Sequence, residues 1–299
     1  AGIQEIAARG AVQLNVANAL WPHVDYPFRK DFLTRTQRFY GVTTTPVDYS
    51  DAEQARTTIN DWVAAQTAAK VQNLIPAGTL DALTRLVLVN AIYFKGDWAN
   101  SFDPALTHPA PFWLTSNGSV QVPFMTLVRE FRYTENAEAQ ILELPYAEGD
   151  LSMLILLPRA PHGLAALEQA MTLETLSSWV QHLRTMKVMV TLPRFKLTAS
   201  FLLNDPLQAM GMVDAFGEAA DFSGMDGTKL LYIGAVLHKA FIAVNEEGTE
   251  AAAATAVEMK LRAAPRQPPT FRADHPFLFL ILEKRTGSIL FLGRVVNPT

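Results

Sequence analysis

Residues 246–269 read EEGTEAAAATAVEMKLRAAPRQPP, a stretch of small and helix-forming residues that does not fit a packed domain. Two structures compete for it. As a helix it is rich in strong helix formers, and Glu258 forms an i,i+4 pair with Arg262. As a strand, every second residue over 249–261 is uncharged, whereas the alternate positions 250–262 hold every charge. This periodicity leaves both alternatives open.

Strand-like segments flank this stretch, with 236–244 before it and 277–282 and 288–295 after it. The run at 86–94 is apolar nearly throughout, which is typical of a strand buried on both faces. Helices and strands mix without regular alternation, so the sequence predicts a single large α+β domain over 1–299 with an extensive mixed or antiparallel sheet. Further strands are predicted at 11–20, 111–114, 120–125, 140–144, 151–157 and 187–195, and helices at 26–40, 52–69 and 164–184.

The composition is that of a core-forming chain, with 49% apolar and 18% charged residues among its 299. Its net charge of −4 provides no basic excess to neutralise phosphates, so nucleic acid is not an expected partner. Apolar runs such as 151–157 and 277–282 are far shorter than the roughly 20 residues of a membrane-spanning helix. We therefore expect neither nucleic-acid binding nor membrane insertion.

Sequence signals of catalysis and of metal binding are absent. Cysteine does not occur, which excludes disulfides, thiolate metal sites and a cysteine nucleophile. The six histidines lie far apart with no pair at ligand spacing, and H-E-x-x-H, G-x-G-x-x-G, G-K-S/T and G-x-S-x-G motifs are missing. The sequence predicts a protein that is not an enzyme and that needs no metal or cofactor.

Six motifs follow one another in an order that matches a known family. The chain resembles the serpins, the serine protease inhibitors, over essentially its whole length. The resemblance implies the serpin fold: a central mixed or antiparallel sheet, further sheets, surrounding helices, and a hinge and mobile reactive loop at 246–269. The motifs are INDW at 59–62, NAIYFKGDW at 90–98, LPRF at 192–195, LHKA and NEEGTE at 237–250, FRADHPFLFLI at 271–281 and GRVVNP at 293–298.

The resemblance implies an inhibitor of which each molecule can act only once. A target serine protease attacks a peptide bond of the loop, here called the bait bond, and forms an acyl-enzyme. The cut loop then inserts into the central sheet as a new strand and distorts the protease; such insertion by serpins is a known case of strand addition. The uncharged alternate positions of 249–261 suit insertion, because burying a charge or a proline there would cost several kcal/mol.

The bait bond follows from the family's spacing. Counting sixteen positions from Glu246 gives Arg262, with Ala263 on the other side of the bond. An arginine suits a protease pocket that holds a carboxylate, so a trypsin-like protease is the expected covalent partner. The alternatives in a shifted register are Lys260, Leu261 and Arg266. The resemblance assigns the hinge to Glu246, Glu247, Gly248, Thr249, Glu250, Ala251, Ala252, Ala253 and Ala254.

Four further residues match the family individually. Asn90 and His238 resemble a pair that holds the middle of the central sheet shut through hydrogen bonds. Trp98 matches a tryptophan at the top of the sheet, where insertion begins. Arg194 and Glu246 fall where many members have a Lys–Glu ion pair; two unpaired surface charges are the alternative.

The resemblance also raises expectations about the whole protein. About eighty residues precede the strand at 11–20 in full-length serpins, and without them the underside of the sheet would expose a large apolar surface. We expect the chain to be an N-terminally truncated, monomeric and secreted protein, although it shows no signal peptide. The alternative function is that of a non-inhibitory serpin, a carrier or chaperone that is cleaved without trapping the protease.

Overall fold

The computed structural model describes residues 12–115, 118–248 and 267–299, which form two compact units. Lys95–Lys196 and Ala243–Thr299 make up most of one unit, and Leu14–Phe94 with Leu197–Ile242 make up the other. The prediction of a single domain over 1–299 stays a prediction. Among the described residues, no helix has the length and apolarity needed to cross a bilayer.

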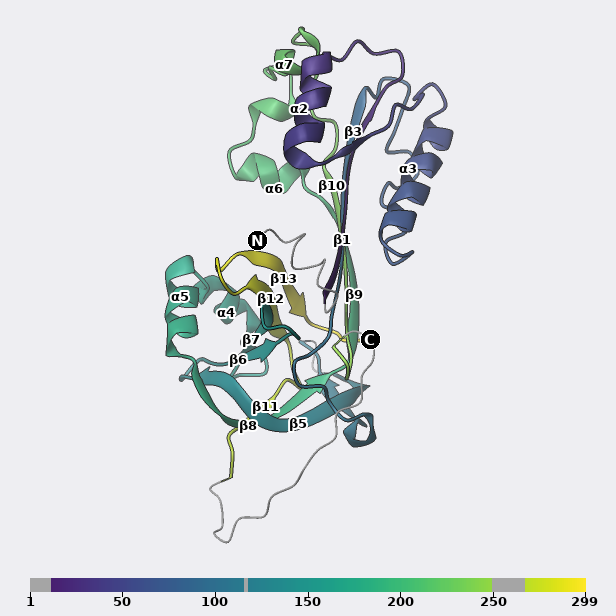
Figure 1. Ribbon diagram of the computed structural model, residues 1–299. Helices are drawn as coiled ribbons and strands as arrows, with labels where there is room; N and C mark the ends of the chain where they lie inside the picture. Colours follow the sequence, from purple (N-terminus) through teal and green to yellow (C-terminus); the bar gives the residue numbers. More distant parts are fainter. Residues whose placement is uncertain (1–11, 116–117, 249–266) are drawn as a thin grey trace. The chain divides into compact units, whose positions relative to one another are not determined.

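The unit around 14–94 and 197–242 is built on a five-stranded sheet in the order β2-β1-β3-β10-β9, in which β3 and β10 are parallel. Helix α3 packs on this sheet through Ala55, Ile59 and Val63 (Figure 1). The N-terminus of α3 is capped by Asp51, whose side chain accepts a hydrogen bond from the Gln54 N–H. The elements are β1 (Val12–Pro22), α2 (Lys30–Tyr40), β2 (Thr43–Thr44), α3 (Ala52–Gln66), β3 (Leu86–Gly96), β9 (Phe195–Leu202), α6 (Asn204–Ala209), α7 (Ser223–Asp226) and β10 (Leu237–Val244).

The apolar run of β3 predicted a strand buried on both faces, but the structure buries only one face over 87–91. Val87, Val89 and Ala91 are buried in the core beneath α3, whereas Leu88 on the other face is 52% exposed. Asn90, also on that face, is half-buried. The prediction was wrong because apolar composition cannot show whether a second layer covers a strand, and α3 covers only one face of this sheet.

The other unit contains an eight-stranded sheet in the order β11-β8-β5-β6-β7-β12-β13, with β4 paired to β5. All its pairs are antiparallel except β11 with β8. Helices α4 and α5 pack on β6, β7 and β12 through a shared apolar cluster (Figure 1). The elements are β4 (His108–Trp113), β5 (Ser119–Glu135), β6 (Ala139–Pro145), β7 (Leu151–Pro158), α4 (Leu164–Ala170), α5 (Leu173–His182), β8 (Arg184–Pro193), β11 (Thr270–Arg272), β12 (Phe277–Glu283) and β13 (Ile289–Val295).

Most predicted elements are present, with one clear error at 164–184. This segment forms two helices rather than one, because Met171 leaves the helical conformation and Thr172 caps the second helix by accepting from the Thr175 N–H. The α+β class is confirmed. The choice between helix and strand for 249–262 lies outside the described residues.

Candidate functional site

The segment predicted to be the hinge begins where β10 ends. After Val244 the chain turns, with reciprocal hydrogen bonds of 3.3 Å between the backbones of Asn245 and Gly248. Gly248 has a φ of 99°, and a Cβ atom there would lie 2.3 Å from the Gly96 carbonyl oxygen and 2.3 Å from the Trp98 nitrogen. Only glycine can adopt this conformation so close to another backbone. The hinge therefore lies directly against the C-terminal end of β3.

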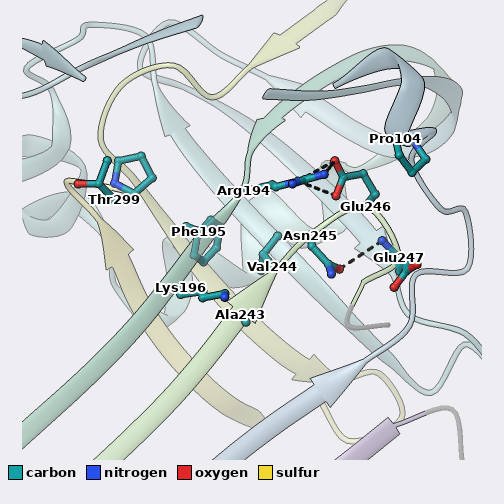
Figure 2. A pocket seen from close by; sticks show the side chains of 11 residues that line it. Pro104, Arg194, Phe195, Lys196, Ala243, Val244, Asn245, Glu246, Glu247 and Thr299 are labelled. Atoms are coloured by element: carbon teal, nitrogen blue, oxygen red, sulfur yellow. Dashed lines mark hydrogen bonds and ion pairs between the residues drawn. The ribbon is translucent and has the colours of Figure 1, made fainter. Parts of the chain in front are cut away.

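Glu246 of the hinge forms the predicted ion pair with Arg194, which joins β8 to β9 (Figure 2). The Arg194 Nε lies 2.7 Å from each carboxylate oxygen of Glu246, and the Thr107 hydroxyl also donates to this carboxylate. The side chain of Glu246 is only 5% exposed, whereas that of Arg194 is 44% exposed. These two residues are thus a nearly buried carboxylate and its cation, not two separate surface charges.

The pKa of Glu246 reflects two opposing effects. Burial by itself raises the pKa, but the hydrogen bonds from Arg194 and Thr107 favour the ionised carboxylate and outweigh it, so the pKa lies below its ordinary value. Because the folded-state pKa is depressed, ionisation of Glu246 stabilises the fold above the unfolded-state pKa. This stabilisation is lost as the pH falls through the folded-state pKa.

Replacement of Arg194 is expected to destabilise the protein in a pH-dependent way. Arg194→Met should lower the free energy of unfolding near pH 7 by about 1.5–3 kcal/mol, because a nearly buried carboxylate loses charged hydrogen bonds. The loss should shrink as the pH falls through the depressed folded-state pKa of Glu246, below which the carboxyl group is protonated in both proteins. Denaturant unfolding at several pH values measures it.

The matched control for this prediction is Lys196→Met, which removes a nearby cation that lines the same pocket. It should change stability by no more than about 0.5 kcal/mol. An equal loss for Arg194→Met at acid and neutral pH would show that the guanidinium acts by packing and not through the carboxylate.

Residues 98–107 hold Asn245 and the first two residues of the predicted hinge. The Trp98 indole N–H donates to the Asn245 carbonyl at 3.0 Å, and the Trp98 backbone N–H donates to the Glu247 carbonyl at 3.0 Å. The Phe102 N–H donates to the Glu246 carbonyl at 2.8 Å. Trp98 stacks on Tyr146 with ring centroids 4.7 Å apart. The backbone of residues 245–247 is therefore held by the segment that follows β3.

Sequence reasoning missed Thr107 and Phe102. Thr107 lies 139 residues from Glu246 along the chain, and no spacing rule connects the two positions. Phe102 contributes only its backbone N–H, which every residue except proline carries. Neither position carries a signal that a single sequence could reveal.

Asn90 and His238 meet in the middle of the five-stranded sheet. They are register partners on β3 and β10, and His238 Nδ1 lies 2.7 Å from Asn90 Oδ1. Asn90 in turn donates to the side-chain oxygen of Asn18 on β1 at 2.7 Å, and Phe201 stacks on the imidazole. Burial disfavours the imidazolium and lowers the pKa of His238. This chain of polar side chains joins three strands of the sheet.

A pocket of about 520 Å³ opens beside the hinge (Figure 2). It brings together two cations and two carboxylates around an aromatic ring: Arg194, Lys196, Glu246, Glu247 and Phe195. Within the described part of the chain, no three His, Asp or Glu side chains are grouped as a metal site requires. The described geometry of this region is that of a held backbone turn at residues 245–248.

The predicted site residues divide into those that the structure places and those outside its description. Glu246, Glu247 and Gly248 lie together with Trp98 and Arg194. Asn90 and His238 form their own pair in the sheet. The rest of the hinge (Thr249, Glu250, Ala251, Ala252, Ala253 and Ala254), the bait bond Arg262–Ala263, and the alternatives Lys260, Leu261 and Arg266 lie outside the described residues.

Comparisons with known proteins agree with one another. A model of the family described as Serpin (serine protease inhibitor) matches residues 3–298. Leukocyte elastase inhibitor A of Rattus norvegicus is 44% identical, over 98% of this chain and 80% of the relative. Serpin B3 of Homo sapiens is 43% identical, over 96% and 75%. The crystal structure of uncleaved ovalbumin matches with a TM-score of 0.88 and 34% identity, over 99% of this chain and 78% of that one.

The two sheets and the helices that pack on them define a class of protein, a large α+β fold. The family within that class is also shown. The chain belongs to the serpin family, the serine protease inhibitors. The predicted serpin fold is confirmed, and protease inhibition is the function that the names of these relatives support.

Proposed function

We propose that this chain is a suicide inhibitor of trypsin-like serine proteases, with Arg262–Ala263 as its bait bond. The observation that carries the proposal is the position of the hinge. Gly248 packs against the end of β3 while its own chain comes from the end of β10. A loop that starts between the ends of two neighbouring strands is placed to enter between them.

The pairing of β3 with β10 explains why a new strand would fit there. These strands are parallel, so a chain that turns back after β10 runs antiparallel to both. Insertion would replace one parallel pairing by two antiparallel pairings, which are slightly more stable per residue. Thirteen residues, 249–261, would extend about 43 Å as a strand. The loop thus has the length and the alternating pattern of a central strand.

The Asn90–His238 contact supports a closed state before cleavage. Its 2.7 Å hydrogen bond crosses the β3–β10 pair that insertion would separate. A strand placed between them would add about 4.8 Å to their distance. The hydrogen bond would then break, and Asn90 and His238 would each need a new hydrogen-bond partner.

The partner in this proposal is the protease, bound as a covalent acyl-enzyme that the inhibitor does not turn over. The chain would be consumed and not catalytic. Several relatives, among them leukocyte elastase inhibitor A of Rattus norvegicus, are named for leukocyte elastase, but arginine at the proposed bait position favours a trypsin-like pocket. A monomeric state, a secreted, extracellular location and a longer N-terminus stay predictions, and the names of the relatives do not support the secreted location.

Incubation with trypsin tests the proposal. The chain in molar excess should yield a band at the summed mass of inhibitor and protease that survives boiling in detergent. Trypsin whose active-site serine has been blocked beforehand should give no such band. Cleavage of the chain with trypsin left fully active would reject the inhibitor function and favour the non-inhibitory alternative.

A further inference from the structure

The pocket beside the predicted hinge is lined by two charged side chains that have no partner. Its volume of about 520 Å³ lies in the range of small-molecule sites. Glu246 and Arg194, which line it, neutralise each other in their ion pair. Lys196 and Glu247 also line it (Figure 2), and neither side chain has an ion-pair or hydrogen-bond partner in the described part of the chain. The pocket therefore contains one unpaired cation and one unpaired anion.

These two side chains come from different elements. Lys196 is the second residue of β9, and Glu247 lies in the turn that follows β10. Because they do not pair with each other, a ligand with a single charge can neutralise only one of them. A zwitterion, which carries both an ammonium and a carboxylate group, can form a charge-assisted hydrogen bond with each. The charges of the pocket thus favour a zwitterion over a simple anion or a simple cation.

The floor of the pocket is apolar. Phe195 and Val244 line it, and both are buried. The ring of Phe195 lies 6.1 Å from that of Phe277 and 5.9 Å from that of Phe279, so it is packed within an aromatic cluster. An apolar floor flanked by a cation and an anion suits an alkyl chain with charged ends.

The backbone of Glu247 is held in place before any ligand binds. Its N–H donates to the side-chain oxygen of Asn245 at 3.2 Å, and its carbonyl accepts from the Trp98 N–H at 3.0 Å. The Trp98 indole also donates to the Asn245 carbonyl at 3.0 Å. A ligand therefore has little backbone to order when it binds, which lowers the entropy cost of binding.

We propose that this pocket binds a small aliphatic zwitterion. The carboxylate of the ligand pairs with Lys196, its ammonium pairs with Glu247, and its alkyl chain lies over Phe195. Bound in this way, the ligand links β9 to the turn after β10. The site goes beyond protease inhibition, because no protease takes part in the binding.

Three probes with the same six-carbon chain test the proposal. 6-Aminohexanoate carries both charges, hexanoate carries only the carboxylate, and hexylamine carries only the ammonium. Ligand-observed NMR at constant ionic strength should show saturable binding of 6-aminohexanoate with a Kd of about 1 mM. Hexanoate and hexylamine should bind about tenfold more weakly, since each leaves one charged side chain of the pocket unpaired. No binding of 6-aminohexanoate, or equal binding of hexanoate or inorganic phosphate, would overturn the proposal.

Two variants test the residues at the ends of the pocket. Lys196→Met and Glu247→Gln should each weaken the binding of 6-aminohexanoate by about tenfold, because each removes one charge-assisted hydrogen bond. Lys196→Met should leave the weak binding of hexylamine unchanged, and Glu247→Gln should leave that of hexanoate unchanged. Wild-type affinity for 6-aminohexanoate in either variant would reject the proposed site.

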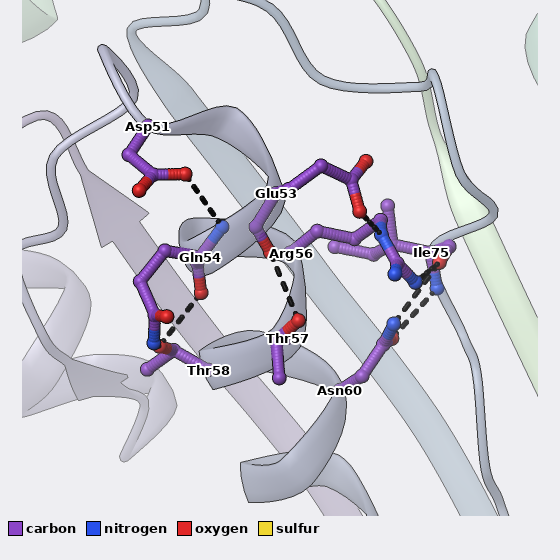
Figure 3. Close-up of polar contacts among 8 residues, drawn as sticks. All are labelled: Asp51, Glu53, Gln54, Arg56, Thr57, Thr58, Asn60 and Ile75. Atoms are coloured by element: carbon purple, nitrogen blue, oxygen red, sulfur yellow. Dashed lines mark hydrogen bonds and ion pairs between the residues drawn. The ribbon is translucent and has the colours of Figure 1, made fainter.

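Glu53→Gln is the matched control for the loss of a carboxylate. Glu53 pairs with Arg56 on the exposed side of α3, in the other compact unit (Figure 3). This variant has the same net charge as Glu247→Gln and should bind 6-aminohexanoate as the wild type does. An equal loss in both variants would show that the net charge of the protein, and not the pocket, governs binding.

Hydrogen exchange measures the link between β9 and the turn. At ten times its Kd, 6-aminohexanoate should slow amide exchange at 245–248 by about tenfold, because the ligand stabilises the closed turn. Hexanoate at the same fractional saturation should leave this exchange unchanged, since it does not reach Glu247. Unchanged exchange with saturating 6-aminohexanoate would contradict the link. These measurements contain no protease, so a chain that fails to trap trypsin can still confirm the site.

Discussion

Thr249→Arg is expected to turn the protein from an inhibitor of trypsin into a substrate. The alternate-residue pattern assigns Thr249 to the first buried position of the inserted strand. Placing an unpaired guanidinium there costs about 3–5 kcal/mol, which slows insertion by about 10²–10⁴-fold. Hydrolysis of the acyl-enzyme should then be faster than loop insertion. A denaturing gel should show cleaved inhibitor in place of the covalent complex.

Glu250→Arg is the matched control for this experiment. Residue 250 belongs to the alternate set of positions that already carries charge, so an arginine there should stay in solvent. The covalent complex should form as in the wild type. Normal trapping by Thr249→Arg, or equal loss in both variants, would contradict strand insertion in this register.

Arg262→Ala should nearly abolish the reaction with trypsin. The carboxylate in the specificity pocket of trypsin would lose its arginine partner. Loss of such a buried polar partner lowers the rate of reaction with a substrate by about 10⁴-fold. The second-order rate of complex formation with trypsin measures the loss. Lys260→Ala and Arg266→Ala serve as parallel variants, since each is a basic residue in the same loop.

The pattern across these three variants locates the bait bond. A loss confined to Arg262→Ala assigns it to Arg262–Ala263, whereas a loss confined to Lys260→Ala or Arg266→Ala moves it to that residue. Arg262→Val provides a gain-of-function test, because the small pocket of elastase accepts a short apolar side chain. This variant should form a covalent complex with elastase while losing the one with trypsin.

The sequence predicted one partner of the Glu246 carboxylate, and the structure added a second. The family motifs around 194 and 246 predicted the pair, and the structure confirms it. The sequence could not reveal that Thr107 donates to the same carboxylate, because the fold alone brings residues 139 positions apart into contact. The carboxylate therefore has a second donor that no motif indicates.

The fold class and most strands were determined by the sequence itself, and its motifs predicted where the hinge lies. These features depend on local periodicity and on motifs in a set order, which a single chain carries in full. Even local structure was not fully predicted. The sequence pattern over 164–184 indicates one helix, but Thr172 caps a second helix and so divides the segment. The alternating pattern over 249–261 likewise determines which positions suit burial, but not whether they are buried.

Only the tertiary structure decided which face of β3 is covered and where backbone strain lies after α3. Leu88 is as apolar as its buried neighbours Val87 and Val89. It is exposed because α3 packs on their face of the sheet and not on the face of Leu88. The strain of Ala68 and Ala69 is invisible in a sequence, because alanine favours a helix and adopts positive φ only when distant contacts impose it. Likewise, no sequence pattern shows that the ammonium group of Lys239 donates to the Gln72 carbonyl at 2.6 Å, since the two residues are 167 positions apart.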